Sequence, residues 1–213
     1  MGPFDLVIFD CDGVLVDSER LAVRTEAEIL SGLGWALSVS DIVERFVGRS
    51  ATYMQQEVER HIGRRVDWEA EFEPRYREVF ERELLPVPGV VEALDQIAVP
   101  TCVASSGSHE KMQFTLGITG LVDRFRDRIF STDEVARGKP APDIFLHAAR
   151  QLGVSPTRCA VVEDSISGVT AGLAADMAVF AFAGGVTTSS QLSIGDAVVF
   201  SDMRDLPALI VAR

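Results

Sequence analysis

Apolar and polar residues follow two different rhythms along this chain, and the change between them divides the chain in two. The short apolar run 6–9 is followed by acidic residues and glycine, which is typical of a buried strand that ends in a turn. From Asp17 to Leu84 apolar residues recur at helical spacing and glycines punctuate the pattern, so this stretch predicts helices without strands. The expected helices run from Asp17 to near Gly32, from Ser40 to Gly48, from Ser50 to Gly63 and from Phe72 to Leu84.

After the turn sequence Pro86-Val87-Pro88-Gly89 the pattern changes, and short apolar runs alternate with helical stretches. This alternation indicates an α/β fold with a doubly wound parallel sheet. The expected strands are 101–105, 128–131, 159–162, 178–182 and 197–200, and the expected helices are 90–97, 109–116, 142–152 and 165–174.

The gap between the first two expected strands is far longer than a crossover requires. About ninety residues separate Phe9 from Thr101, whereas a crossover between parallel strands needs about a dozen. We therefore expect a core domain formed by residues 1–15 and 88–213, and a helical domain formed by residues 16–87 and inserted after the first strand. The insert is expected to stand over the carboxyl edge of the sheet.

Composition and charge narrow the class of protein. The chain has 213 residues, of which 47% are hydrophobic, and its formal net charge is −12 with no block of Lys or Arg. Nucleic acids and anionic membranes bind positive surfaces, so neither is an expected partner. No apolar run approaches the ~20 residues of a membrane span, and no secretory leader is apparent. Together with an odd number of cysteines (Cys11, Cys102 and Cys159), expected to be free thiols, this predicts a cytoplasmic protein.

Acidic side chains follow two of the expected strands. Asp10 and Asp12 come directly after the first strand, and Glu163 and Asp164 come at the end of the strand that begins near Cys159. Open α/β sheets hold their ligands at this carboxyl edge, and crowded carboxylates repel one another unless a cation or a shared proton relieves them. Such oxygens suit Mg²⁺. The alternative is a solvated acidic turn at the first strand and an ordinary helix cap at Asp164-Ser165.

Two further sites are candidates for binding an anion. Ser105, Ser106 and Gly107 come at the end of an expected strand and before a helix, where hydroxyls and free N–H groups can cradle phosphate. Lys139 lies between Gly138 and a Pro-Ala-Pro sequence that limits the freedom of the backbone, so its ammonium suits a contact with phosphate or with a crowded carboxylate. A plain capping loop and a solvated lysine are the simpler alternatives.

Together and in this order, these motifs resemble the haloacid dehalogenase superfamily. The series is Asp-x-Asp-Gly-x-x-x-Asp-Ser from Asp10, an apolar strand ending in Ser105, Gly-Lys-Pro around Lys139, and an apolar strand followed by Glu-Asp-Ser from Glu163. The helical insert resembles the cap of the β-phosphoglucomutase-like branch. The resemblance implies a Rossmann-like core with a helical cap domain, a Mg²⁺ cofactor and phosphoryl chemistry. The segment 98–112 is most similar to phosphatases of sugar phosphates or phosphorylated sugar acids.

The resemblance also implies a role for each residue. Asp10 is the expected nucleophile, Asp12 the general acid and base, and Ser105 and Lys139 the groups that hold phosphoryl oxygens. Ser106 and Gly107 are expected to contact substrate. The expected magnesium ligands are Asp10, Asp12 through its backbone carbonyl and Asp164, with Glu163 supporting or sharing that shell.

Departures from the mutase pattern favour hydrolysis. The resemblance implies that a β-phosphoglucomutase carries a His on its first cap helix, and the matching residue here is Ala22. It also implies a Lys before the glycine of the cap loop, and the loop around Gly48 and Arg49 lacks that Lys. Gly48 and Arg49 stay candidates for substrate contacts. The leading hypothesis is a monomeric phosphatase of a small phosphorylated metabolite, acting through an aspartyl phosphate. The alternatives are a sugar-phosphate mutase and a non-enzymatic phospho-receiver, which needs neither Asp12 nor a helical insert.

Overall fold

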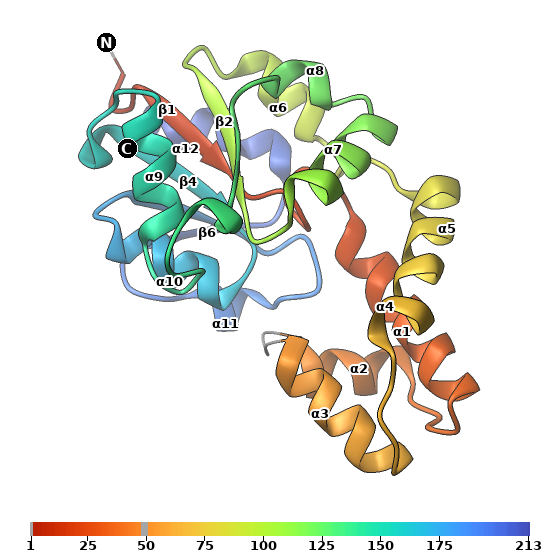
Figure 1. Ribbon diagram of the computed structural model, residues 1–213. Coiled ribbons are helices and arrows are strands. Elements are labelled where there is room, and N and C mark those ends of the chain that lie inside the picture. Colours follow the sequence, from red (N-terminus) through yellow and green to blue (C-terminus); the bar gives the residue numbers. More distant parts are fainter. Residues whose placement is uncertain (1, 48–50) are drawn as a thin grey trace. The chain divides into compact units, whose positions relative to one another are not determined.

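The computed structural model describes residues 2–47 and 51–213, and within them the larger part of the chain is built around one parallel sheet (Figure 1). Its strand order is β3-β2-β1-β4-β5-β6. The α/β class and the parallel, doubly wound sheet expected from the sequence are confirmed. The strands are β1 (Leu6–Phe9), β2 (Thr101–Ser105), β3 (Ile129–Ser131), β4 (Cys159–Glu163), β5 (Ala178–Phe182) and β6 (Val198–Phe200).

The strand order reverses direction between β1 and β4. The chain proceeds from β1 outward through β2 to β3, and then returns to place β4 on the other side of β1. Phe9 is paired with Val162, and the ladder continues one residue further because Asp10 N donates to Val162 O at 3.0 Å. Ligands of open α/β sheets bind at such a reversal, outside the carboxyl ends of the strands. The two acidic strand ends therefore meet where this fold places a site.

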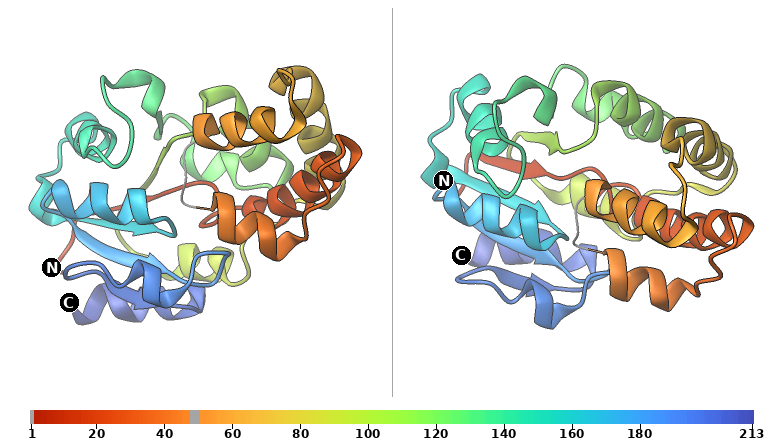
Figure 2. Two further views of the ribbon diagram at one scale, coloured as in Figure 1. Left: turned by 90° about the horizontal axis from the view of Figure 1, so that it is seen from below. Right: turned by 60° about the horizontal axis from the view of Figure 1, so that its bottom comes forward.

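Helices cover both faces of the sheet, and Figure 2 shows α10 and α12 on opposite sides of the strands. Alternate strand residues such as Leu6 and Ile8 join a fully buried cluster with Ile144 and Phe145 of α9 and Val169 of α10. Such a sheet is buried on both faces, which explains why its strands read as continuous apolar runs. The helices of this part are α6 (Val90–Gln96), α7 (His109–Ile118), α8 (Val122–Phe125), α9 (Asp143–Gln151), α10 (Ile166–Ala174), α11 (Ser189–Leu192) and α12 (Leu206–Ala212).

Three of these helices were not expected from the sequence. The helices α8 and α11 have four residues each, so they are too short to show a helical period. The helix α12 has seven residues, and only Leu206 and Ile210 on it are buried. The helices α8 and α11 pack against strands of the sheet and α12 packs against α6, and local sequence does not show these tertiary contacts.

The inserted segment is all helical and forms a unit of its own, from Ser18 to Leu84. The long helices α1 and α5 are joined across their contact by an ion pair between Arg24 and Glu83 at 2.6 Å and by the Tyr76 hydroxyl, which donates to Glu26 at 2.9 Å. A short helix, α4, precedes α5 and was not separated from it in the sequence-based expectation. The helices are α1 (Ser18–Gly32), α2 (Val39–Phe46), α3 (Ala51–Ile62), α4 (Trp68–Glu71) and α5 (Glu73–Glu83).

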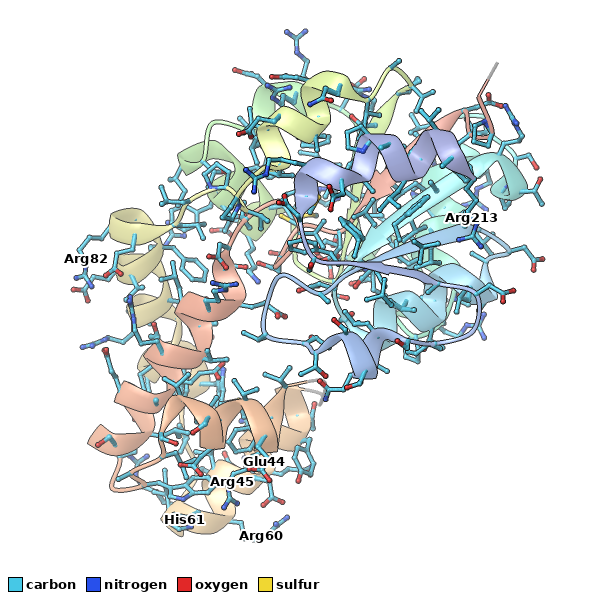
Figure 3. The ribbon with its side chains drawn as sticks, turned by 180° about the vertical axis from the view of Figure 1, so that it is seen from behind. Glu44, Arg45, Arg60, His61, Arg82 and Arg213 are labelled. Atoms are coloured by element: carbon cyan, nitrogen blue, oxygen red, sulfur yellow. The ribbon has the colours of Figure 1, made fainter. Side chains whose placement is uncertain are left out.

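Aromatic stacking joins the connection between α1 and α2 to the end of α3 within this unit. The Trp35 ring stacks on His61 with ring centroids 4.1 Å apart, and the Arg45 guanidinium lies 6.0 Å from the centre of the Trp35 ring. Figure 3 labels His61 and Arg45 in this part of the helical unit. A cavity of about 340 Å³ opens beside this cluster, and none of the candidate catalytic residues lines it. Its lining residues are Trp35, Asp41, Glu44, Arg45, Phe46, Tyr53 and Glu57.

The other unit comprises residues 1–17 and 85–213. Compared with the expected boundaries it gains residues 16–17 and 85–87, which were expected to belong to the insert. The reason is that the two connecting segments pair with each other: Asp17 N donates to Leu85 O and Val87 N donates to Leu15 O, each at 3.0 Å. This pairing attaches both connections to the sheet unit. No helix in the described parts of the chain has the length and apolar character that crossing a bilayer requires.

Candidate active site

Three strand ends carry the candidate catalytic side chains. Asp10 follows β1, Ser105 is the last residue of β2, and Glu163 ends β4 with Asp164 after it. All four side chains are buried. Because β2, β1 and β4 are neighbours in the sheet, strand ends that are 58 and more positions apart in sequence come to one edge.

Lys139 joins two of these strand ends. Its ammonium donates to Asp10 Oδ1 and to Glu163 Oε1, both at 2.6 Å, and to the backbone oxygen of Ala104 at 3.1 Å. An ammonium has three donors, so all three are used. The Lys139 side chain is only 4% exposed. A buried charge is stable only when it is paired and hydrogen-bonded, and this one is.

The charges at this edge alter the proton affinity of its members. Burial raises the pKa of Asp10 to about 6; Lys139 opposes this rise and Glu163 adds to it. Burial by itself would lower the pKa of Lys139, but the carboxylates of Asp10 and Glu163 outweigh it and raise that pKa above its usual value. At neutral pH this arrangement therefore holds an ionised Asp10 beside a charged lysine.

Glu163 is held on every side by protein groups. Its Oε1 accepts from Lys139, and its Oε2 accepts from the backbone N and the hydroxyl of Ser165, each at 2.9 Å. A Cβ atom on Gly168 would overlap this carboxylate, so glycine there is needed for the close approach of α10. From the sequence, Glu163 is expected in or beside a metal shell. Its contacts are those of a residue that positions Lys139.

Asp12 is paired with a lysine that the sequence analysis did not select. Lys111 Nζ donates to Asp12 Oδ2 at 2.7 Å, across 99 positions of sequence. Burial would lower the pKa of Lys111, but Asp12 outweighs it and raises that pKa to about 12. One signal could have identified this residue: of the 20 Lys and Arg residues in the chain, only Lys111 and Lys139 are lysines.

Asp164 lies against the turn that follows β1. Gly13 has a φ of +73°, and a Cβ there would overlap the Asp164 carboxylate, so the turn needs glycine both for its backbone and for this approach. Asp10 and Asp164 thus place two buried carboxylates at adjoining strand ends, and the Asp12 backbone carbonyl belongs to the same turn. Oxygen donors of this kind fit Mg²⁺, which typically takes one or two carboxylates and keeps several waters. Within the described ranges no three His, Cys, Asp or Glu side chains form a cluster that could hold a metal without such further ligands.

The loop after β2 is tied to the end of β3. Ser105 Oγ accepts from Gly107 N at 3.3 Å, Ser131 Oγ donates to Gly107 O at 2.9 Å, and the Thr132 hydroxyl donates to Ser106 O at 3.3 Å. Ser108 then caps α7. The structure thus places Ser105, Ser106 and Gly107 together at the same edge as Asp10.

The remaining predicted residues, Gly48 and Arg49, lie outside the described residues. The three cysteines, expected to be free thiols, are free and buried. Cys11 sits between the two aspartates and contacts the Thr115 hydroxyl, and burial raises its pKa well above the usual value, so it is an inert core residue.

Comparison with known proteins places this site in a family. A family model described as haloacid dehalogenase-like hydrolase matches residues 4–176. The chain belongs to the haloacid dehalogenase-like hydrolases, and it is an enzyme.

Its relatives include phosphatases. The chain is 30% identical to the 6-phosphogluconate phosphatase of Escherichia coli (strain K12), with 100% of this chain and 97% of that protein covered. It is 30% identical to hexitol phosphatase B of the same organism, with 80% and 79% covered. Among solved structures, a haloacid dehalogenase-like protein of unknown function from Agrobacterium tumefaciens strain C58 is 38% identical, with a TM-score of 0.89 and 98% of each chain covered.

Proposed function

We propose that this protein is a Mg²⁺-dependent phosphatase that hydrolyses a small phosphorylated sugar or sugar acid through an aspartyl phosphate. The observation that carries the proposal is the buried Asp10–Lys139–Glu163 group at the reversal point of the sheet. It supplies an ionised nucleophile beside a cation, at the same edge of the sheet as Ser105 and the loop before α7.

The reaction has two steps, and the same pair of aspartates serves both. In the first, an Asp10 carboxylate oxygen bonds to phosphorus, the ester P–O bond breaks, and Asp12 gives its proton to the departing oxygen. In the second, Asp12 accepts a proton from water, the resulting hydroxide bonds to phosphorus, and the Asp10–phosphorus bond breaks. Asp10 returns as a carboxylate and phosphate leaves.

Lys139 and the β2 loop hold the phosphoryl group. Lys139 orients Asp10 through Oδ1 and its charge balances the negative charge that accumulates on the phosphoryl oxygens. The Ser105 hydroxyl and the backbone N–H of Ser106 would donate to the same oxygens. Asp10, Asp164 and the Asp12 carbonyl would hold Mg²⁺, whose chemistry is to reduce the repulsion between an anionic nucleophile and an anionic phosphate.

The substrate class comes from the relatives, since the sequence alone does not define it. The match to 6-phosphogluconate phosphatase extends over nearly the whole of both chains and supports a phosphorylated sugar acid. The match to hexitol phosphatase B covers less of both chains and supports a phosphorylated polyol. Gly48 and Arg49 stay the proposed substrate contacts of the cap, and the monomeric state and cytoplasmic location stay predictions.

A panel of phosphorylated sugars, polyols and sugar acids tests the proposal directly. We expect Mg²⁺-dependent release of inorganic phosphate from the wild-type protein and no turnover by the Asp10→Asn variant. An isomerised sugar phosphate in place of free phosphate would identify a mutase. Undiminished phosphate release by Asp10→Asn would refute the assignment of the nucleophile.

A further inference from the structure

The two lysines of this chain occupy different environments at the same edge. Lys139 is locked, with a side chain that is 4% exposed, whereas the Lys111 side chain is 45% exposed and pairs with an Asp12 side chain that is 22% exposed. An ion pair this open to water adds little to stability. The Lys111–Asp12 pair therefore contributes little to the stability of the fold, and we consider a role for it in the active site.

The backbone of Lys111 is fixed from several directions. Its N–H donates to the Ser108 cap at 3.2 Å, and the loop before that cap is tied to the end of β3 through Gly107 and Ser131. His109, in the same first turn of α7, contacts Glu134 at 2.9 Å. Lys111 thus extends from a helix start whose backbone is held by several hydrogen bonds.

Lysine is also the less common choice in this protein. The chain uses arginine for 18 of its 20 basic residues, and its two lysines each donate to one aspartate of the Asp10-Cys11-Asp12 sequence. A compact ammonium can approach one carboxylate oxygen closely, whereas a planar guanidinium requires a wider bidentate contact. Nucleophile and acid–base residue are therefore each supplied with a point charge of their own.

We propose that Lys111 is the positioning residue for Asp12 and holds its ionised carboxylate in the orientation required to accept the proton of water in the second step. This inference rests on the proposed function. Asp12 follows Asp10 by two residues, and Asp164 approaches Gly13 in the same turn. The carboxylates of Asp10 and Asp164 therefore repel the Asp12 carboxylate. An ammonium at 2.7 Å counters that repulsion and prevents the side chain from rotating into solvent.

A double-mutant cycle separates this role from a direct contact with substrate. Lys111→Met should lower kcat by about tenfold to a hundredfold, the range that coupled neighbours give, with KM little changed. Lys111→Arg should recover part of the loss. In an Asp12→Asn background Lys111→Met should change the rate by less than about twofold, because the partner through which it acts is gone. An aryl phosphate, whose leaving group needs no proton, keeps the slow variants measurable.

The control is Gln113→Met, which puts the same residue on an exposed position of the same helix and should leave turnover as in the wild type. A rise in KM with unchanged kcat, an unaltered Lys111→Met enzyme, or an equal loss in the wild-type and Asp12→Asn backgrounds would each overturn the inference. The last of these results would mean that Lys111 acts on the substrate itself.

Selective ¹⁵N labelling of lysine gives a readout that does not need turnover, because the chain contains two lysines and therefore two side-chain ammonium signals. We expect Asp12→Asn to move one signal and Asp10→Asn to move the other. Lys111→Met assigns the two signals by deleting one. If Asp12→Asn moves neither, the ion pair does not form and the inference fails, even where the wild-type protein releases phosphate. A wild-type protein that releases no phosphate from any ester refutes the proposed function instead, and the positioning role falls with it.

Discussion

A half-buried carboxyl group between α1 and α5 predicts how the stability of the helical unit depends on pH. Glu26 accepts a hydrogen bond from the Tyr76 hydroxyl at 2.9 Å. Burial raises the pKa of Glu26 from its usual 4.5 to about 7, against the opposing effect of that hydrogen bond. The perturbation that tests this is Glu26→Gln, since glutamine keeps the shape and the acceptor oxygen but never ionises.

The magnitude follows from the two pKa values. At about 1.36 kcal/mol for each pKa unit, the difference between 4.5 and about 7 corresponds to about 3 kcal/mol. The folded form binds this proton more tightly than the unfolded form. The stabilisation is therefore complete below pH 4.5, falls as the pH rises, and is lost above pH 7. At pH 8.5 we expect Glu26→Gln to be more stable than the wild type by about 3 kcal/mol, and at pH 4.5 we expect the two to be nearly equal.

Tryptophan fluorescence in a denaturant titration measures this unit selectively, because both tryptophans of the chain, Trp35 and Trp68, lie within Ser18–Leu84. Taking the difference between variant and wild type removes the contribution of Asp10, whose raised pKa acts in the same pH range. Glu28→Gln makes the same charge change at an exposed position of α1 and serves as the control. Parallel pH profiles for the Glu26→Gln and wild-type proteins would refute the reasoning.

Two further predictions concern the site. Gly168→Ala drives a methyl group into the Glu163 carboxylate, so it should destabilise the sheet unit by about 1–3 kcal/mol and also lower kcat by displacing the partner of Lys139. Gly172→Ala, on the same helix as Gly168, crowds Val179 of β5 and should destabilise the sheet unit without the loss in kcat per folded molecule. Equal losses of kcat in both variants would contradict the role of Glu163. Chelation of divalent cations should abolish phosphate release, and added Mg²⁺ should restore it in the wild type but not in Gly13→Ala, whose new methyl group displaces Asp164. Activity that survives chelation would remove the metal from the proposal.

The pattern of apolar and polar residues is sufficient to predict the class of fold and the order in which the chemical groups follow one another along the chain. Runs such as Leu6–Phe9 and Cys159–Val162 are buried on both faces of the sheet, so they are continuously apolar. The first acidic residue after each run therefore identifies the end of the strand. Asp10, Ser105 and Asp164 could be selected for that reason. Lys139 could be selected because Gly and Pro beside it restrict its backbone.

Only the tertiary structure decided which of these groups touch. The contact of Lys111 with Asp12 and that of Lys139 with Glu163 span 99 and 24 positions, and no local pattern encodes them. The short helices α8 and α11 and the terminal helix α12 could not be predicted from the sequence either. Each is stabilised by packing against the rest of the protein and is too short for its apolar residues to show a helical spacing. Local sequence encodes which faces are apolar and where the chain turns, whereas contacts between distant side chains depend on where folding brings them.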